Sequence, residues 1–175
     1  MDFKILNRDI VYRGRAFDVQ KVFLELPNQK QSYYDLVDHK NSVTILPIDE
    51  FGDVWFVTQF RLGSDGQLLE LPAGVIEDQE APEICAIREI QEEIGMAAKN
   101  LVFLGDFYLA AGYSNEHMFT YLAKDLYPSV LNQDADEFLK VSKIPIKEVL
   151  EMMHKGKFQD AKTLATLALA LHLIE

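Results

Sequence analysis

Residues 74–96, GVIEDQEAPEICAIREIQEEIGM, place seven acidic residues in a segment whose apolar residues recur at helical spacing. Glu89, Glu92 and Glu93 are three or four positions apart, so a helix brings their side chains to one face within reach of a common point. Like charges at these spacings repel, and the segment contains no lysine to relieve the repulsion. Two interpretations follow from helix geometry alone: a solvated acidic surface, or a site for a hard divalent cation such as Mg²⁺ or Mn²⁺.

The same segment carries start and stop signals of a helix. Pro82 suits a first helical position, Glu83 suits the positive end of the helix dipole, and Gly95 suits a left-handed cap. The sequence therefore predicts a helix over residues 82–94. Arg88 lies four positions before Glu92 and is expected to pair with it or to orient a neighbouring carboxylate. Four isoleucines are expected to anchor this helix against a sheet, at positions 84, 87, 90 and 94.

The flanking patterns predict an α+β fold, an α/β/α sandwich with helices on a mixed sheet. Alternating segments before residue 41 predict an antiparallel extension, with FKIL and DIVYR as two short strands and a hairpin of AFDVQKVFLEL with QSYYDLVDH. SVTILPI and DVWFVTQF, on either side of EFGD, predict a second hairpin in a core sheet. Later strands are expected near residues 101–108, in HMFTYLA and in FLKVSKI, followed by a helix in IKEVLEMMHKG and one capped by Asp160. We divide the chain into residues 1–41, the strand extension, and residues 42–175, the main domain.

Composition limits the classes of function. The chain has 175 residues, of which 49% are hydrophobic, and a net charge of -11, which opposes non-specific binding to nucleic acid. No apolar run reaches the roughly 18 residues of a membrane span, and the first residues lack the pattern of a signal peptide. We therefore expect a cytoplasmic protein without a membrane partner. The single cysteine, Cys85, is expected to be a small buried apolar residue.

The spacing within residues 74–96 resembles the motif of the Nudix hydrolases: Gly, five residues, Glu, seven residues, Arg-Glu, an aliphatic residue, any residue, Glu-Glu, any residue, Gly, an aliphatic residue. The matching positions are Gly74, Glu80, Arg88, Glu89, Ile90, Glu92, Glu93, Gly95 and Met96. The predicted strands and helices around the motif are also similar to the Nudix fold. The resemblance favours the metal interpretation of the acidic helix.

The resemblance implies a set of site residues. The catalytic group comprises Arg88, Glu89, Glu92 and Glu93, and the last three bind Mg²⁺ or Mn²⁺ beside a diphosphate, helped by the carbonyl of Ala73. Gly74 belongs with the substrate-binding positions and needs only to supply a backbone conformation. For Glu80 two roles stay open, a supporting metal ligand or hydrogen bonding within its loop.

Two further segments, YRGRAFDVQKVFLELPN and VTQFRLGSDGQLLELPAG, are similar to ADP-ribose pyrophosphatases and related nucleotide-sugar diphosphatases. This similarity implies hydrolysis of ADP-ribose to AMP and ribose 5-phosphate, and a homodimer built through the N-terminal strands. Arg61 is then expected to bind substrate phosphate or terminal ribose. Glu70 is expected to accept hydrogen bonds from adenine or ribose, with a structural ion pair as the alternative.

Two positions depart from that branch. A glutamate from an acidic loop commonly assists the attacking water, and here Glu137 and Asp136 are the candidates, because Ala135 replaces one expected acid. Ala111 stands where many ADP-ribose hydrolases have proline. Both departures leave the metal site untouched and weaken the assignment of the substrate, so GDP-mannose or another nucleotide sugar remains the alternative. The altered loop also leaves a non-catalytic nucleotide-sensing domain as a third possibility.

Overall fold

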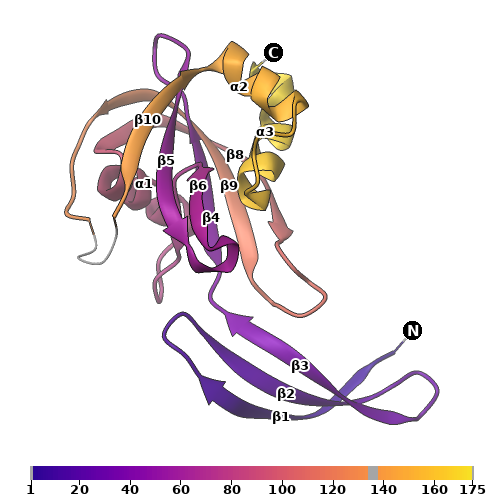
Figure 1. Cartoon of the computed structure of the whole chain (residues 1–175). Coiled ribbons are helices and arrows are strands. Elements are labelled where there is room, and N and C mark those ends of the chain that lie inside the picture. The colour runs from indigo at the N-terminus through magenta and orange to yellow at the C-terminus, as the bar shows by residue number, and fades with distance from the viewer. Residues whose placement is uncertain (1, 134–137, 175) are drawn as a thin grey trace. The chain divides into compact units, whose positions relative to one another are not determined.

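The structure is a computed structural model that describes residues 2–133 and 138–174 (Figure 1). The chain divides into two compact units. One contains the residues up to Asn41 together with Tyr108–His117, and the other contains Ser42–Phe107 with the residues from Met118 onward. In the described part of the chain, no helix is long and apolar enough to cross a membrane.

The first unit is a three-stranded antiparallel sheet in the order β1-β2-β3. Its strands are β1 (Lys4–Arg13), β2 (Phe17–Glu25) and β3 (Gln31–His39). The hairpin of β2 and β3 confirms the prediction. The two short strands expected before it form one strand, β1, which is interrupted by register shifts after Ile5 and Ile10. Backbone hydrogen bonds join Val37 of β3 to Tyr113 and Asn115 in the segment 108–117.

The described residues of the second unit form two sheets. The four-stranded sheet has the order β7-β4-β9-β8 and the three-stranded sheet the order β10-β5-β6. The bounds are β4 (Ser42–Pro47), β5 (Asp53–Arg61), β6 (Gly66–Glu70), β7 (Ala73–Val75), β8 (Met96–Tyr108), β9 (His117–Pro128) and β10 (Lys140–Pro145), with a short 3-10 turn at Leu62–Ser64. β4 runs parallel to β9 and antiparallel to β7. The predicted mixed sheet is confirmed.

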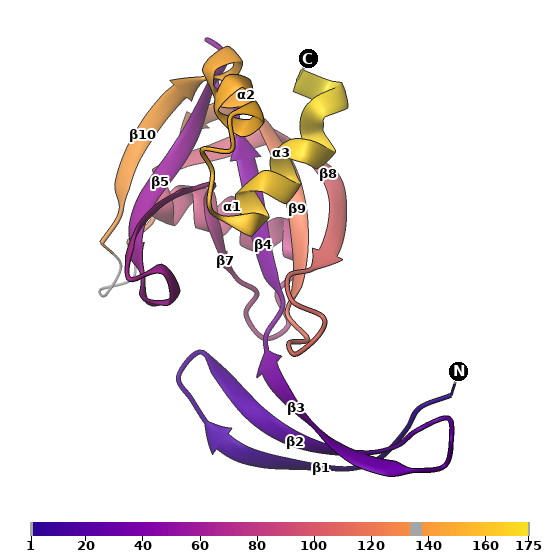
Figure 2. The same cartoon turned by 45° about the vertical axis from the view of Figure 1, so that its right-hand side comes forward.

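Within the described residues, three helices cover these sheets: α1 (Pro82–Glu93), α2 (Ile146–His154) and α3 (Ala161–Ile174). Figures 1 and 2 show α1 on one side and α2 and α3 on the other. One apolar cluster packs α1 against the sheets and contains Ile90, Ile45 and Tyr121. A second cluster packs α2 and α3 against the sheets and contains Leu46 and Leu167. This arrangement confirms the predicted α/β/α sandwich.

The predicted hairpin of β4 with β5 is wrong. A tight turn does connect the two strands, with the amide of Asp49 donating to the carbonyl of Asp53 over 3.0 Å. Beyond this turn the strands enter different sheets, because both edges of β4 are taken by β7 and β9 and both edges of β5 by β10 and β6. The apolar pattern identified two buried strands but carried no information about their partners.

Helix α1 ends one residue before its predicted limit, and Gly95 takes the expected left-handed conformation with φ 69°. One isoleucine does not face the sheet, since 63% of Ile84 is exposed to solvent. Cys85 and Ala86, both fully buried, lie there instead, because small side chains allow the helix backbone to approach the sheet closely. The N-cap prediction for α3 is confirmed, since the amide of Thr163 donates to the Asp160 carboxylate over 3.0 Å.

Candidate active site

Arg88 lies at the centre of the acidic face of α1. Its Nη1 donates to Glu89 Oε1 over 2.6 Å and to Glu92 Oε2 over 2.9 Å. Its Nε and Nη2 donate to the two oxygens of Glu80, each over 2.9 Å. These hydrogen bonds, those with Glu80 first, raise the pKa of the Arg88 guanidinium above its ordinary value. The predicted pairing of Arg88 with Glu92 is confirmed, and one cation serves three carboxylates.

Glu80 joins the loop before α1 to the helix. Its carboxylate also accepts a hydrogen bond from the amide of Glu77 over 3.0 Å. The fork from Arg88 lowers the pKa of Glu80 to about 2, against the opposing effect of burial. Glu80 thus makes the loop hydrogen bonding that the sequence left open as one of its two roles.

Gly74 lies directly against the carboxylate of Glu89. It belongs to β7, where it pairs with Val43 of β4. A Cβ atom at Gly74 would lie 2.0 Å from both Cδ and Oε1 of Glu89, far closer than carbon and oxygen atoms can approach. The position therefore requires glycine for space, since its φ is not in the left-handed region.

Glu93 faces the same strand as Gly74. Only 2% of Glu93 is exposed, and its Oε2 accepts a hydrogen bond from the amide of Ala73 over 3.1 Å. Glu89 is also buried, at 7% exposure. A plain solvated surface does not bury carboxylates, so the first interpretation of the acidic helix does not describe these two residues.

The donor set fits a hard divalent cation by its chemistry, because it consists of carboxylates beside a strand whose carbonyls lie close by. Within residues 2–133 and 138–174, no three His, Cys, Asp or Glu side chains are arranged as a preformed metal site. Nη1 of Arg88 contacts both Glu89 and Glu92. The ligand roles of Glu89, Glu92, Glu93 and Ala73 stay predictions.

A second charged cluster surrounds Glu70 at the end of β6. Arg61 of β5 forms a two-pronged contact with it, Nε to Oε1 over 2.9 Å and Nη2 to Oε2 over 2.7 Å. Lys162 of α3 contacts the same Oε2 and also pairs with Asp160 Oδ1 over 3.0 Å. Burial raises the pKa of Glu70, but Arg61 and Lys162 together outweigh it, so the pKa lies below its ordinary value. Glu70 thus makes the ion pair that was the structural alternative, and the substrate contacts of Arg61 and Glu70 stay predictions.

Sequence reasoning missed Lys162 as a member of this cluster. The residue follows the recognised N-cap Asp160 by two positions, and it is an amphipathic residue in the first turn of an apolar helix. The burial of Lys162, at 7% exposure, is what indicates that its charge is paired. No local pattern in the sequence reveals it, because its partner Glu70 lies 92 positions away.

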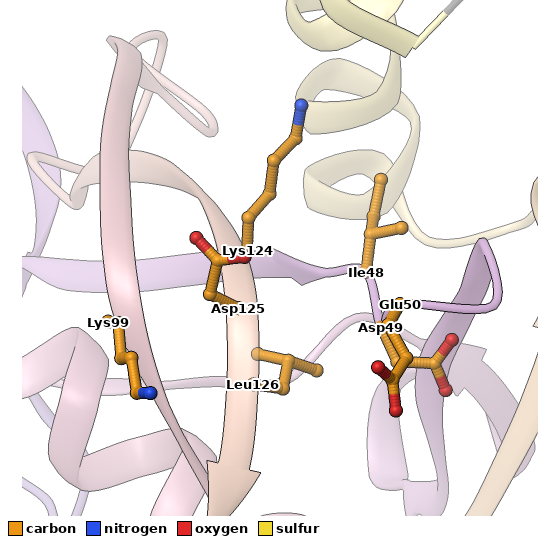
Figure 3. A pocket seen from close by; sticks show the side chains of 7 residues that line it. All are labelled: Ile48, Asp49, Glu50, Lys99, Lys124, Asp125 and Leu126. Atoms are coloured by element: carbon orange, nitrogen blue, oxygen red, sulfur yellow. The ribbon is translucent and has the colours of Figure 1, made fainter.

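The other predicted positions lie elsewhere. Glu137 and Asp136 fall outside the described residues. Ala111 is exposed in a turn of the first unit, where the amides of Tyr113 and Ser114 both bond the carbonyl of Ala110. A separate pocket has a volume of about 330 Å³, and none of the predicted site residues that the structure describes lines it. Figure 3 shows the side chains of its walls. Its walls are Ile48, Asp49, Glu50, Lys99, Lys124, Asp125 and Leu126.

Comparison with known families bears on the interpretation of α1. The model of the NUDIX domain matches residues 38–167 of this chain. The chain belongs to the Nudix hydrolase family. The acidic segment that contains Glu80, Arg88, Glu89, Glu92 and Glu93 is thus the Nudix motif, and Nudix hydrolases generally depend on divalent metal ions.

The Nudix relatives cover nearly the whole chain. An ADP-ribose pyrophosphatase of Bacillus subtilis is 33% identical over 167 residues, which span 93% of this chain and 89% of that protein. A GDP-mannose pyrophosphatase of an Enterobacter species is 32% identical, over 94% of this chain and 90% of that protein. A crystal structure of an ADP compounds hydrolase superposes with a TM-score of 0.88 at 28% identity, over 99% of this chain and 95% of that one. The match therefore includes the N-terminal strands as well as the Nudix motif.

Proposed function

We propose that this Nudix hydrolase cleaves the diphosphate bond of a nucleotide sugar, with ADP-ribose as the first candidate and AMP and ribose 5-phosphate as products. The observation that carries the proposal is the buried carboxylate pair of Glu89 and Glu93 facing β7. The similarity of nearly the whole chain to an ADP-ribose pyrophosphatase supports the choice of substrate.

Glu89, Glu92 and Glu93, with the carbonyl of Ala73, would hold Mg²⁺ or Mn²⁺. When bound, the metal would neutralise phosphate oxygens and lower the pKa of a water molecule that attacks phosphorus. Arg88 fixes two of these carboxylates through Nη1, and Gly74 leaves the space that Glu89 occupies. The chain's own contribution is therefore a rigid, acidic surface on which the diphosphate and its metal are positioned.

Arg61 supplies the positive charge that an anionic substrate needs in a chain of net charge -11. Its guanidinium is fixed by Glu70 and remains 42% exposed, so it can bind a phosphate or ribose oxygen. We assign Glu137 as the candidate that assists the attacking water, by resemblance alone. Glu70 contributes through Arg61 and keeps its predicted place among the substrate-binding residues.

We also propose that the chain forms a homodimer through its N-terminal sheet. Large apolar side chains are exposed along β1, among them Ile5, Ile10, Val11 and Tyr12, and such patches mark interfaces between proteins. Light scattering of the purified protein should give twice the chain mass of 20.0 kDa. A monomeric mass would overturn this part of the proposal. The cytoplasmic location stays a prediction.

The test of the function is a turnover assay with product identification. Purified protein with Mg²⁺ should convert ADP-ribose to AMP and ribose 5-phosphate, as measured by mass spectrometry. Glu93→Gln should lower kcat/KM at least about a hundredfold, as loss of a group that stabilises a transition state typically does. Glu151→Gln is the matched control, because Glu151 is an exposed glutamate that pairs only with Lys155 among the described residues.

GDP-mannose is the second candidate, favoured by the 32% identity to a GDP-mannose pyrophosphatase. The same assay with GDP-mannose, ADP-hexoses and nucleoside triphosphates separates the substrates by kcat/KM. Metal-dependent turnover of GDP-mannose above ADP-ribose would replace the first candidate. Absence of turnover for every compound would favour a non-catalytic nucleotide-sensing domain.

A further inference from the structure

The first turn of α3 contacts the strands that lead into the active site. Lys162 is 7% exposed, and its Nζ lies between Glu70 Oε2 of β6 and Asp160 Oδ1 of its own turn. Lysine is rarely buried unless its charge is paired, and here two carboxylates supply that pairing. The lysine therefore connects the start of α3 to the end of β6.

The connection continues to Arg61. Glu70 is 1% exposed, and it receives Nε and Nη2 of the arginine. Two nitrogens of the guanidinium fork are thus used within the protein. In the described ranges, 2–133 and 138–174, the third, Nη1, donates to no protein acceptor and is the nitrogen left for a ligand.

The four charged groups are electrically balanced. Arg61 and Lys162 contribute two positive charges, and Glu70 and Asp160 contribute two negative charges. Removing one member of such a set leaves an uncompensated buried charge, which moves or attracts water. Loss of the lysine would leave Arg61 as the one cationic partner of Glu70 in the described chain. The Glu70 carboxylate would then move toward solvent, and the guanidinium of Arg61 would move with it.

A second contact fixes the backbone of the same strand. Thr163 Oγ1 accepts a hydrogen bond from the amide of Leu71 over 2.9 Å and donates one to Asp160 Oδ2 over 2.6 Å. Both the side chain of Glu70 and the amide after it are therefore held by one helical turn. Two residues further on, the amide of Ala73 donates to Glu93, so this turn sets the path of the chain into β7.

We infer that Lys162 is a positioning residue for substrate binding, which acts through Glu70 to hold the guanidinium of Arg61 with Nη1 directed at the nucleotide sugar. This inference rests on the proposed function. It differs from a purely structural role for Lys162 in one respect. A structural lysine stabilises the fold whatever residue is present at position 61, whereas a positioning lysine affects substrate binding only while Arg61 is present.

A double-mutant cycle tests this difference. Lys162→Met keeps a long unbranched stem and removes the charge. It should raise KM for ADP-ribose about tenfold with kcat nearly unchanged, because a hydrogen bond to a charged group is worth at least that factor. Arg61→Met should raise KM by a similar or larger factor. In the Arg61→Met background, Lys162→Met should add no further increase in KM.

The control and the conservative variant complete the design. Lys155→Met removes an exposed lysine that pairs with Glu151, and its KM should equal that of the wild type. Lys162→Arg keeps the charge and should recover part of the lost affinity. Where Lys162→Met does not fold, Asp160→Asn replaces it, since asparagine keeps the N-cap hydrogen bond to Thr163 while weakening the hold on Lys162.

The outcomes separate the inference from the proposed function. A tenfold increase in KM that vanishes in the Arg61→Met background supports the inference. Equal increases in both backgrounds, or an unchanged KM in a folded Lys162→Met or Asp160→Asn protein, would overturn it while the proposed function stands. A wild-type protein that hydrolyses no nucleotide sugar would overturn both.

Discussion

Two arginines organise the second unit of this Nudix hydrolase, and their surroundings differ in charge. Arg88 contacts three carboxylates, those of Glu80, Glu89 and Glu92. Arg61 belongs to a set of two cations and two carboxylates. The first cluster therefore has a surplus of negative charge, and the second has none.

The difference indicates what each cluster can do. A cluster with surplus negative charge gains free energy when a cation joins it, and α1 carries one further buried carboxylate, Glu93. A cluster without net charge gains no such free energy from a cation, and its ion pairs hold the side chains in a fixed geometry. This difference agrees with the proposal that cations bind around Arg88 and that the residues around Arg61 orient the substrate.

The largest expected effect comes from removing each arginine in turn. Arg88→Met leaves three carboxylates near one another, and it should lower the free energy of unfolding by about 3 kcal/mol without metal. Arg61→Met should cost only about 1 kcal/mol, because Lys162 still pairs with Glu70. Urea denaturation in EDTA measures both. Equal losses would contradict the difference in charge balance between the clusters.

The next effect is the response to Mg²⁺. The cation should bind the folded state at the surplus carboxylates and add about 2.7 kcal/mol at a hundred times its dissociation constant. Thermal unfolding with and without MgCl₂ measures the gain in Tm.

Substitutions in the two clusters should affect this gain in Tm differently. Glu92→Gln combined with Glu93→Gln should abolish the gain in Tm, whereas Lys162→Met should retain it. A gain that survives the loss of Glu92 and Glu93 would place the cation elsewhere.

A smaller effect is expected at Gly74. Gly74→Ala introduces a Cβ 2.0 Å from the Glu89 carboxylate, and the side chain must move away. The substitution should cost about 2 kcal/mol, typical of overpacking, and lower Tm by about 4–8 °C. Gly63→Ala is the control, since a Cβ there meets nothing within 4 Å. If both variants melted alike, the close approach of Glu89 to β7 would be disproved.

The same two clusters show what the sequence could predict. Glu89, Glu92 and Arg88 are separated by at most four positions, so helix periodicity alone placed them together, and the helix limits followed from Pro82 and Gly95. Lys162 and Glu70 are 92 positions apart, and only the packing of α3 on the sheet brings them together. Local patterns therefore predicted the pairing of Arg88 with Glu92 and missed Lys162 in the cluster around Arg61.

The prediction of the fold also succeeded for local features and failed for long-range ones. The sequence predicted most strands and all three helices, because alternation, apolar runs and caps are local properties. It was wrong in pairing β4 with β5, since both are buried and an apolar run does not specify its neighbours. It was also wrong about Ile84, because the helix turns its small residues Cys85 and Ala86 toward the sheet.

The last expected effect concerns the pH dependence of the cluster around Arg88. The fork from Arg88 lowers the pKa of Glu80 from 4.5 to about 2 in the folded protein. A carboxylate whose pKa is lower in the folded state stabilises the fold above its unfolded pKa, and this stabilisation is lost as the pH falls through the folded value. The contribution of Glu80 should therefore be complete above pH 4.5 and disappear between pH 4.5 and about 2.

Glu80→Gln removes this contribution. The free energy of unfolding of the variant, measured by urea denaturation at successive pH values, should fall less steeply than that of the wild type across this window. Glu151→Gln is the matched control, because Glu151 is exposed and its pairing with Lys155 is screened by solvent. A Glu80→Gln curve parallel to the wild-type curve would show that Arg88 does not hold Glu80 in solution. The local cluster would then consist of Glu89 and Glu92 alone, and the loop before α1 would owe its conformation to its backbone.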